Sequence, residues 1–186
     1  MPISYHFPIS LERYFELGKA NDFPKVDCCP LCRAKNQLLR HGFYERNAIE
    51  QEVCYRIPIC RLICPDCRKT FSILPDFLLP YFQHTLEFMI RILLQIWLWG
   101  NRLCSRQLGR FYEKRCYGKL TEIEQFFRKS GYHEPFPQNH KKKAIALLQM
   151  IQALERASFV RRWWSHLVTS PLAHSLYHGS RVVTID

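Results

Sequence analysis

The sequence contains no hydrophobic run that is long enough to cross a membrane. Its most apolar stretch, residues 86–99, has about 14 residues, whereas a membrane-spanning helix needs roughly 20. Glu87, Arg91 and Gln95 interrupt this stretch at every fourth position, which is typical of a helix packed in a protein core. The N-terminus also lacks the basic segment and apolar run of a signal peptide. We therefore expect a cytoplasmic protein without a membrane segment.

Acidic residues are scarce relative to basic ones. The chain of 186 residues has 16 Asp and Glu but 27 Lys and Arg, which gives a formal net charge of +11 and a pI near 9.4. The net charge is −1 in residues 1–27, +3 in residues 28–80 and +9 in residues 81–186. Such a basic excess favours a polyanionic partner, most often a nucleic acid. Simple solubility and attraction to an anionic membrane surface are the alternatives.

No constellation of catalytic residues is evident in the sequence. The acidic residues are scattered, without the spacing that paired carboxylates would need. Cys104 and Cys116 have no obvious partner base. We therefore predict that the protein is not an enzyme.

The nine cysteines are the most informative residues that are present. In a reducing cytosol, paired CxxC motifs bind metal more often than they form disulfides. Two such motifs, residues 29–32 and 64–67, both read Cys-Pro-x-Cys. Each CxxC turn directs two sulfurs toward one centre, and two turns complete the tetrahedral shell that Zn2+ favours. The predicted zinc ligands are Cys29, Cys32, Cys64 and Cys67.

Four sulfurs close the coordination shell, so the predicted zinc would be structural rather than catalytic. Arg33 and Arg68 follow the two motifs, and their charge would offset the double negative charge of a Zn(Cys)4 centre. Iron could replace zinc in such a shell, and Cys28 could exchange with its neighbour Cys29. His41 is expected on a strand surface rather than as a ligand. The other cysteines are expected to be buried without a metal: Cys54, Cys60, Cys104 and Cys116.

The patterns predict an α+β fold in three parts. Residues 1–27 form an N-terminal arm, residues 28–80 a β-rich zinc ribbon, and residues 81–186 a mostly α-helical region that resembles a helix-turn-helix and binds DNA. In the arm, residues 11–17 are expected to be helical, and three prolines should keep the rest irregular.

Three strands are expected in the ribbon, at residues 37–44, 53–63 and 70–74. Residues 47–52 would form the tip of the hairpin between the first two. Because Pro58 has no N–H, the second strand should be an edge strand or carry a bulge at this position.

The expected helices are residues 86–99, 106–115, 122–129 and a fourth from about residue 141. Ser105 would cap the second helix, and Thr121 would open a capping box with Glu124 at the start of the third. The fourth helix is expected to continue to about Val168. Residues 181–186 are expected to form a strand.

Basic residues recur at every fourth position along the second of these helices. The predicted stripe consists of Arg102, Arg106, Arg110 and Lys114. Leu108, Phe111 and Tyr112 would pack on the preceding helix. A capped helix that is apolar inside and basic outside is what a helix-turn-helix reader of DNA requires. A solvated charged face is the alternative.

Further basic residues are predicted to contact nucleic acid. Beside the stripe and at the start of the fourth helix, these are Arg115, Lys141, Lys142 and Lys143. On the predicted hairpin, the candidates for phosphate contacts are Arg40, Arg46 and Arg56. The sequence Arg-Arg-Trp-Trp at residues 161–164 could stack on bases, although core packing is the commoner use of such tryptophans.

The ribbon motifs resemble a known family. After the motif at residues 29–32 and a strand pair, residues 61–72 read Arg-Leu-Ile-Cys-Pro-Asp-Cys-Arg-Lys-Thr-Phe-Ser. This arrangement resembles the zinc ribbon of bacterial insertion-sequence transposases, in which a helix-turn-helix often follows. Residues 74–81 are also similar to short, uncharacterised zinc-ribbon proteins found near mobile elements. The resemblance covers about residues 28–115 and implies duplex-DNA binding in a transposon context.

One part of the transposase pattern does not match. Such transposases carry an RNase H-like catalytic domain with three metal-binding carboxylates, and no such domain fits residues 81–185. Residues 182–186 read Val-Val-Thr-Ile-Asp, as the first strand of such a domain would. One hypothesis is therefore the DNA-binding half of a split or truncated transposase, and an ordinary terminal strand is the alternative.

These observations predict a zinc-containing, non-catalytic protein that binds duplex DNA through a basic helix. A transposase or other protein subunit, or a second copy of the chain, could be an additional partner. The alternative is a zinc-ribbon module that binds protein or RNA while docked on a larger nucleic-acid machine.

Overall fold

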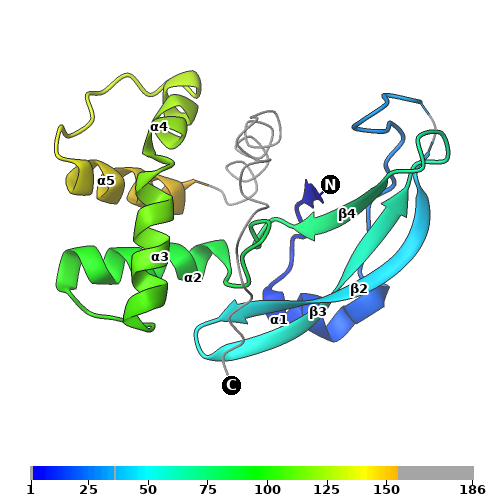
Figure 1. The fold of residues 1–186 in the computed structure, drawn as a ribbon, viewed down its shortest axis with the longest axis horizontal. Helices are drawn as coiled ribbons and strands as arrows, with labels where there is room; N and C mark the ends of the chain where they lie inside the picture. The colour runs from blue at the N-terminus through cyan, green and yellow to red at the C-terminus, as the bar shows by residue number, and fades with distance from the viewer. Residues whose placement is uncertain (1, 36, 155–186) are drawn as a thin grey trace.

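The computed structural model describes residues 2–35 and 37–154 of the chain. These residues form a four-stranded sheet followed by a group of helices, an α+β arrangement as the sequence predicts. The sheet and the helical group occupy opposite sides of the molecule in Figure 1. No helix in the described residues has both the length and the apolar character that crossing a membrane requires.

The strands are β1 (Pro2–Tyr5), β2 (Leu39–Glu50), β3 (Val53–Ile63) and β4 (Thr70–Pro75). The helices are α1 (Leu11–Leu17), the 3-10 turn η1 (Gly18–Ala20), α2 (Leu86–Leu94), the π-helical turn η2 (Gln95–Trp99), α3 (Arg106–Tyr117), α4 (Leu120–Lys129) and α5 (His140–Ala153). The order in the sheet is β1-β4-β3-β2, in which β1 is parallel to β4 and the other neighbours are antiparallel.

The hairpin of β2 and β3 is longer than the sequence predicts. β3 has the expected bounds, but β2 continues to Glu50 and stays paired with β3 from Leu39 onward, apart from a bulge beside Gly42. The predicted tip at residues 47–52 therefore shrinks to Gln51 and Glu52. Gln51 adopts a left-handed conformation with φ of 56°, which closes this tight turn.

The segment before the ribbon packs on the sheet. β1 forms a parallel pair with β4, which corrects the expectation that the segment is irregular outside its helix. Pro2 is tolerated because it is the first residue of its strand. Phe7 and Tyr14 meet edge to face with ring centroids 4.9 Å apart, in the same core as the ribbon strands.

Pro58 lies where β3 has a strand neighbour on one side only, because β4 pairs with Arg61–Ile63 and no further. This agrees with its predicted edge character. The hydroxyl of Tyr14 on α1 donates a hydrogen bond to the Pro58 carbonyl at 2.9 Å. Because α1 packs here, residues 57–60 are all buried. Buried and exposed residues therefore do not alternate along this part of β3.

The start of α3 is as predicted, whereas the start of α4 is not. The Ser105 hydroxyl accepts the Leu108 N–H at 3.3 Å and caps α3. α4 begins at the buried Leu120, and its N-cap residue makes no side-chain hydrogen bond. The predicted capping box from Thr121 to Glu124 is therefore wrong, because the helix starts two residues earlier than predicted, where Leu120 is buried in the core.

α5 begins at His140 and is capped by Asn139, whose side chain accepts the Lys142 N–H at 3.0 Å. The helix ends at Ala153, because Leu154 is extended with ψ of 145°. It does not continue unbroken toward residue 168 as predicted. The remainder of that prediction, the Arg-Arg-Trp-Trp segment and the terminal strand lie outside the described residues.

The described chain contains two apolar cores. One joins α1 to the sheet and includes residues up to Leu78, and the other is formed by α2 to α5 and begins with Leu79. The tip of the β2–β3 hairpin docks on the connector between β4 and α2, residues 76–85. The Ile49 N–H donates to the Gln83 carbonyl at 2.8 Å, and the Thr85 N–H donates to the Ile49 carbonyl at 3.0 Å.

Candidate metal centre and nucleic-acid interface

The two CxxC motifs fold into turns with the same backbone hydrogen bonds. The N–H of Arg33 donates to the Cys29 carbonyl, and the N–H of Arg68 donates to the Cys64 carbonyl, both at 3.0 Å. Both arginines are left-handed, with φ of 59° and 57°. These turns lie side by side at the end of the sheet that is remote from the helices (Figure 1). The two CxxC turns therefore have the same backbone geometry, and they lie next to each other as in a zinc ribbon.

The four predicted ligands form a cluster that fits a tetrahedral metal ion. Their sulfur atoms all lie within 4.8 Å of one another, and the pairs Cys29–Cys67 and Cys32–Cys64 are each 3.7 Å apart. A zinc–sulfur bond of about 2.3 Å places tetrahedral sulfurs about 3.8 Å apart. The donor set and the spacing therefore suit Zn2+, and four sulfurs leave no open coordination position.

Crowding of the four thiols alters their acidity. Burial raises the pKa of Cys29, but hydrogen bonds from the backbone N–H groups of Cys32 and Leu31 and from neighbouring thiols lower this pKa to about 6. The Ala34 backbone N–H lowers the pKa of Cys32, but the Cys29 thiol and burial together raise this pKa to about 12. The cluster thus favours the thiolate of Cys29 over that of Cys32, and a bound dication would favour all four thiolates.

The remaining cysteines and His41 lie apart from this cluster. Cys28 is exposed, and its thiol is directed to the Arg33 carbonyl at 3.6 Å, so Cys29 rather than Cys28 belongs to the sulfur cluster. His41 is exposed on β2, as predicted. Cys60 is buried as expected. Cys54 is exposed near the end of the hairpin, and Cys104 and Cys116 are only partly buried, which corrects that expectation.

α3 presents basic side chains to solvent along one face. Arg106, Arg110 and Lys114 are all exposed at successive helical turns. Arg102 is also exposed, but it precedes the helix, so the predicted four-residue stripe is shortened to three. None of these side chains forms an ion pair with any acidic group in the described residues.

The inner face of α3 is anchored to the rest of the helical group. Tyr112 is buried and its hydroxyl lies 2.7 Å from Nδ1 of His84, and the Trp97 indole donates to Glu113 at 2.7 Å. Gly109 allows a close approach, because a Cβ at this position would lie 3.0 Å from the Ile96 side chain. The inner face of α3 is therefore packed against the other helices and the connector, while its basic face remains exposed.

Two of the predicted side chains around this helix behave differently from the prediction. Phe111 is 41% exposed rather than packed on the preceding helix, although its ring lies 6.1 Å from that of Phe82. The Arg115 guanidinium lies 5.2 Å from the centre of the Phe111 ring. Arg115 is therefore partly occupied by a cation–π contact.

The basic start of α5 divides into exposed and paired side chains. Lys141 and Lys142 are exposed, whereas Lys143 forms an ion pair with Glu124 at 3.0 Å. Arg128 also lies near Glu124, at 3.7 Å, and donates to the Glu134 carbonyl at 2.7 Å. Lys143 and Arg128 therefore connect elements of the helical group.

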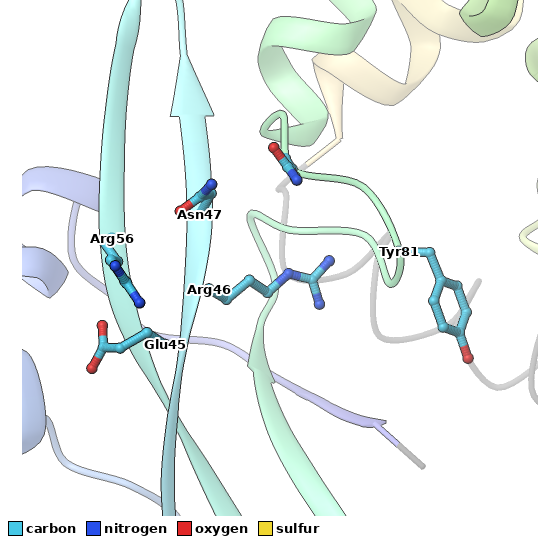
Figure 2. A pocket seen from close by; sticks show the side chains of 6 residues that line it. Glu45, Arg46, Asn47, Arg56 and Tyr81 are labelled. Atoms are coloured by element: carbon cyan, nitrogen blue, oxygen red, sulfur yellow. The ribbon is translucent and has the colours of Figure 1, made fainter. Parts of the chain in front are cut away.

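The arginines of the hairpin also differ in their surroundings. Arg40 and Arg56 are exposed, but the Arg46 guanidinium crosses from β2 to the connector, as Figure 2 shows. It donates to the Leu79 carbonyl at 2.9 Å and to the Phe82 carbonyl at 2.7 Å. The predicted phosphate contact by Arg46 is thus replaced by a structural contact between sheet and connector.

The corner between η2 and α3, residues 98–105, exposes apolar side chains that the sequence does not predict to be exposed. Trp99 is 62% exposed, Leu98 is 42% exposed and Leu103 is 44% exposed. The apolar pattern of residues 86–99 predicts that Leu98 and Trp99 pack in the core. At the end of a helix, however, the sequence pattern does not determine whether an apolar side chain is buried. The nearby Gly100, which is left-handed with φ of 69°, was the available signal that the chain turns away here.

Residues 29–98 match the family model described as a domain of unknown function, DUF6431. The match starts at Cys29, the first of the four clustered cysteines, and ends within η2, so it spans the ribbon, the connector and α2 but not α3. No curated protein and no solved structure matches the chain.

Proposed function

We propose that this protein is a non-catalytic, zinc-dependent binder of duplex DNA and that α3 makes the principal contact. The observation that carries the proposal is the face of Arg106, Arg110 and Lys114, which are exposed and have no acidic partner within the described residues. These residues span about 12 Å along the helix axis, on the order of the width of the B-DNA major groove. Such cations contact phosphates and, in favourable cases, guanine edges.

The other lysines and arginines support this choice by contrast. Several basic side chains elsewhere are used within the fold: Lys119 pairs with Glu122 at 2.6 Å, and Lys143 pairs with Glu124. The exposed side chains of Arg106, Arg110 and Lys114 have no such acidic partner in the described residues. Exposed Lys141 and Lys142 at the start of α5 would add phosphate contacts.

The metal centre would serve this function indirectly. A closed shell of four sulfurs would stabilise the ribbon rather than activate a substrate. The β2–β3 hairpin begins beside the metal turns and ends on the connector that leads into α2. A folded ribbon would thereby fix the position of the helical group relative to the sheet. The motif at residues 61–72 supports a transposon-related role, through its resemblance to transposase ribbons.

Removing charge from α3 tests the proposal. We expect the double variant Arg106→Ala with Arg110→Ala to bind duplex DNA more weakly and to reduce the slope of log K against log salt by about 1.8, since each lost phosphate contact accounts for about 0.9. A matched control removes two exposed cations far from α3, Arg13 and Lys19. Its salt slope should stay within about 0.3 of the wild-type value.

Equal binding by the α3 variant and the control would contradict a DNA-contacting α3. Loss of duplex binding to an excess of single-stranded RNA would instead favour the RNA-binding alternative. Association that requires no nucleic acid and is insensitive to salt would favour a protein-interaction module.

A further inference from the structure

The corner between η2 and α3 exposes large apolar side chains beside unpaired cations. Trp99 is 62% exposed, and Leu98 and Leu103 are 42% and 44% exposed. Arg102 and Arg106 are exposed within the same stretch of chain. In Figure 1 this corner lies at the end of the helical group that is remote from the sheet. Three large apolar side chains exposed within one short stretch of chain point to an interaction site.

The corner is anchored to α3 on its inner side. Trp97 is buried, its indole N–H donates to Glu113 at 2.7 Å, and its ring lies 5.3 Å from that of Tyr117. Gly109 provides the close approach to Ile96. The exposed Leu98 and Trp99 therefore project from a turn whose neighbouring residues are fixed by packing and hydrogen bonding.

The charge around the corner indicates what covers it. Arg102 lies between Trp99 and Leu103 in the chain, and Arg106 begins the basic face of α3. None of these cations has an acidic partner in the described part of the chain. A ligand that offers negative charge beside an apolar surface would complement this corner. Nucleic acids combine these two properties, since phosphates flank stacked bases.

We propose that Trp99, supported by Leu98 and Leu103, inserts against the bases of the DNA that α3 holds and partly unstacks one base step. This inference rests on the proposed function and adds to it that the bound duplex is distorted. Apolar wedges of this kind unstack base steps and kink duplex DNA by about 20–90°. Arg102 and Arg106 would hold the phosphates on either side of the opened step.

The test uses the full-length, zinc-loaded protein and a set of duplexes with 2-aminopurine at successive positions, whose fluorescence rises when that base is unstacked. Wild-type protein should raise the fluorescence at one region of the duplex. Trp99→Ala should abolish the rise and weaken binding by about tenfold to hundredfold, because base–aromatic stacking is lost. The salt slope should not change, since no phosphate contact is removed.

Two further variants keep the test informative. Trp99→Phe retains an aromatic ring and should restore most of the fluorescence rise. Leu39→Ala removes a side chain that is 55% exposed on the ribbon and should bind as the wild type does. Thermal unfolding and zinc content of each variant confirm that the fold is intact.

Several outcomes would overturn the inference, and each differs from failure of the proposed function. Duplex binding without any rise in fluorescence, or unchanged binding by Trp99→Ala, would refute the wedge while leaving a DNA-binding α3. Loss of self-association in Trp99→Ala, with DNA binding intact, would identify a protein interface instead. Absence of duplex binding by the wild type would refute the proposed function and the wedge together.

Discussion

Replacing Arg46 by Ala should destabilise the protein far more than replacing Arg56, an exposed arginine on the same hairpin. The Arg46 guanidinium donates to the carbonyls of Leu79 and Phe82 at 2.9 and 2.7 Å, whereas Arg56 is exposed. Burial lowers the pKa of Arg46 from its ordinary value of 12.5, yet an arginine remains charged at neutral pH. Its hydrogen bonds are therefore charge-assisted, and they join the sheet to the connector.

The expected loss follows from these two bonds. A hydrogen bond from a charged donor contributes about 1.5–3 kcal/mol, and two bonds that share one side chain are not additive. The Leu79 carbonyl also accepts the Phe82 N–H at 3.2 Å, so it keeps a donor after the substitution. We expect Arg46→Ala to lose about 2–4 kcal/mol, with most of the loss coming from the Phe82 carbonyl.

Urea unfolding of the zinc-loaded protein, followed by circular dichroism, measures this loss. With a urea dependence of about 2 kcal/mol per M, the midpoint should fall by about 1–2 M for Arg46→Ala. Arg56→Ala should change the free energy of unfolding by no more than about 0.5 kcal/mol. Equal unfolding midpoints for the two variants would refute the structural role of Arg46. The salt slope of DNA binding should be unchanged in Arg46→Ala, because this guanidinium is engaged by the carbonyls of Leu79 and Phe82.

Two other predictions concern the metal and the connector. Cys64→Ser should release the zinc and unfold the ribbon, because structural zinc contributes on the order of 10 kcal/mol or more to folding. Cys54→Ser, which replaces an exposed cysteine, is the control. Full zinc content in Cys64→Ser would refute the proposed set of ligands. Burial lowers the pKa of His84 from its ordinary value of 6.5, so the unfolded chain binds a proton at a higher pH than the folded chain does. The stability conferred by neutral His84, which is hydrogen-bonded to Tyr112, should be complete above pH 6.5 and decline as the pH falls below it. The stability difference between the wild type and His84→Gln should therefore shrink in acid, and a difference that is constant with pH would contradict the assignment.

The four-cysteine cluster and most helices could be predicted because they depend on short-range geometry. A CxxC turn needs only four residues to bring two sulfurs together, and the structure places all four predicted sulfurs within 4.8 Å of one another. Likewise, Ser105 caps α3 through a hydrogen bond to a residue three positions away. Interactions of this kind involve residues that are close in the sequence, so the sequence alone can predict them.

The pairing of β1 with β4 could not be predicted in the same way. Pro2 is aligned with Ser72, so the pairing joins positions 70 residues apart. A short strand that begins with Pro carries little local signal, and its pairing depends on the edge that β4 leaves free. For this reason the prolines of residues 1–27 predict irregular structure, whereas part of this segment forms strand β1 of the sheet.

The hairpin arginines show the same limit for function. Arg46 and Arg56 look alike in sequence, but the connector reaches only Arg46, whose two carbonyl partners lie 33 and 36 residues away. The basic stripe was partly readable from a four-residue period. That period could not show that the helix begins after Arg102 or that Phe111 stays exposed beside Arg115.

The most direct test of the central claim is fluorescence anisotropy of a labelled DNA duplex titrated with the full-length, zinc-loaded protein at salt concentrations from about 50 to 200 mM. Three to six contacts from the exposed, unpaired cations of α3 and its surroundings predict a slope of log K against log salt between about −3 and −5. This binding should survive an excess of unlabelled single-stranded RNA. A slope near zero, absence of binding, or complete loss of binding to the RNA competitor would contradict a duplex-DNA-binding function.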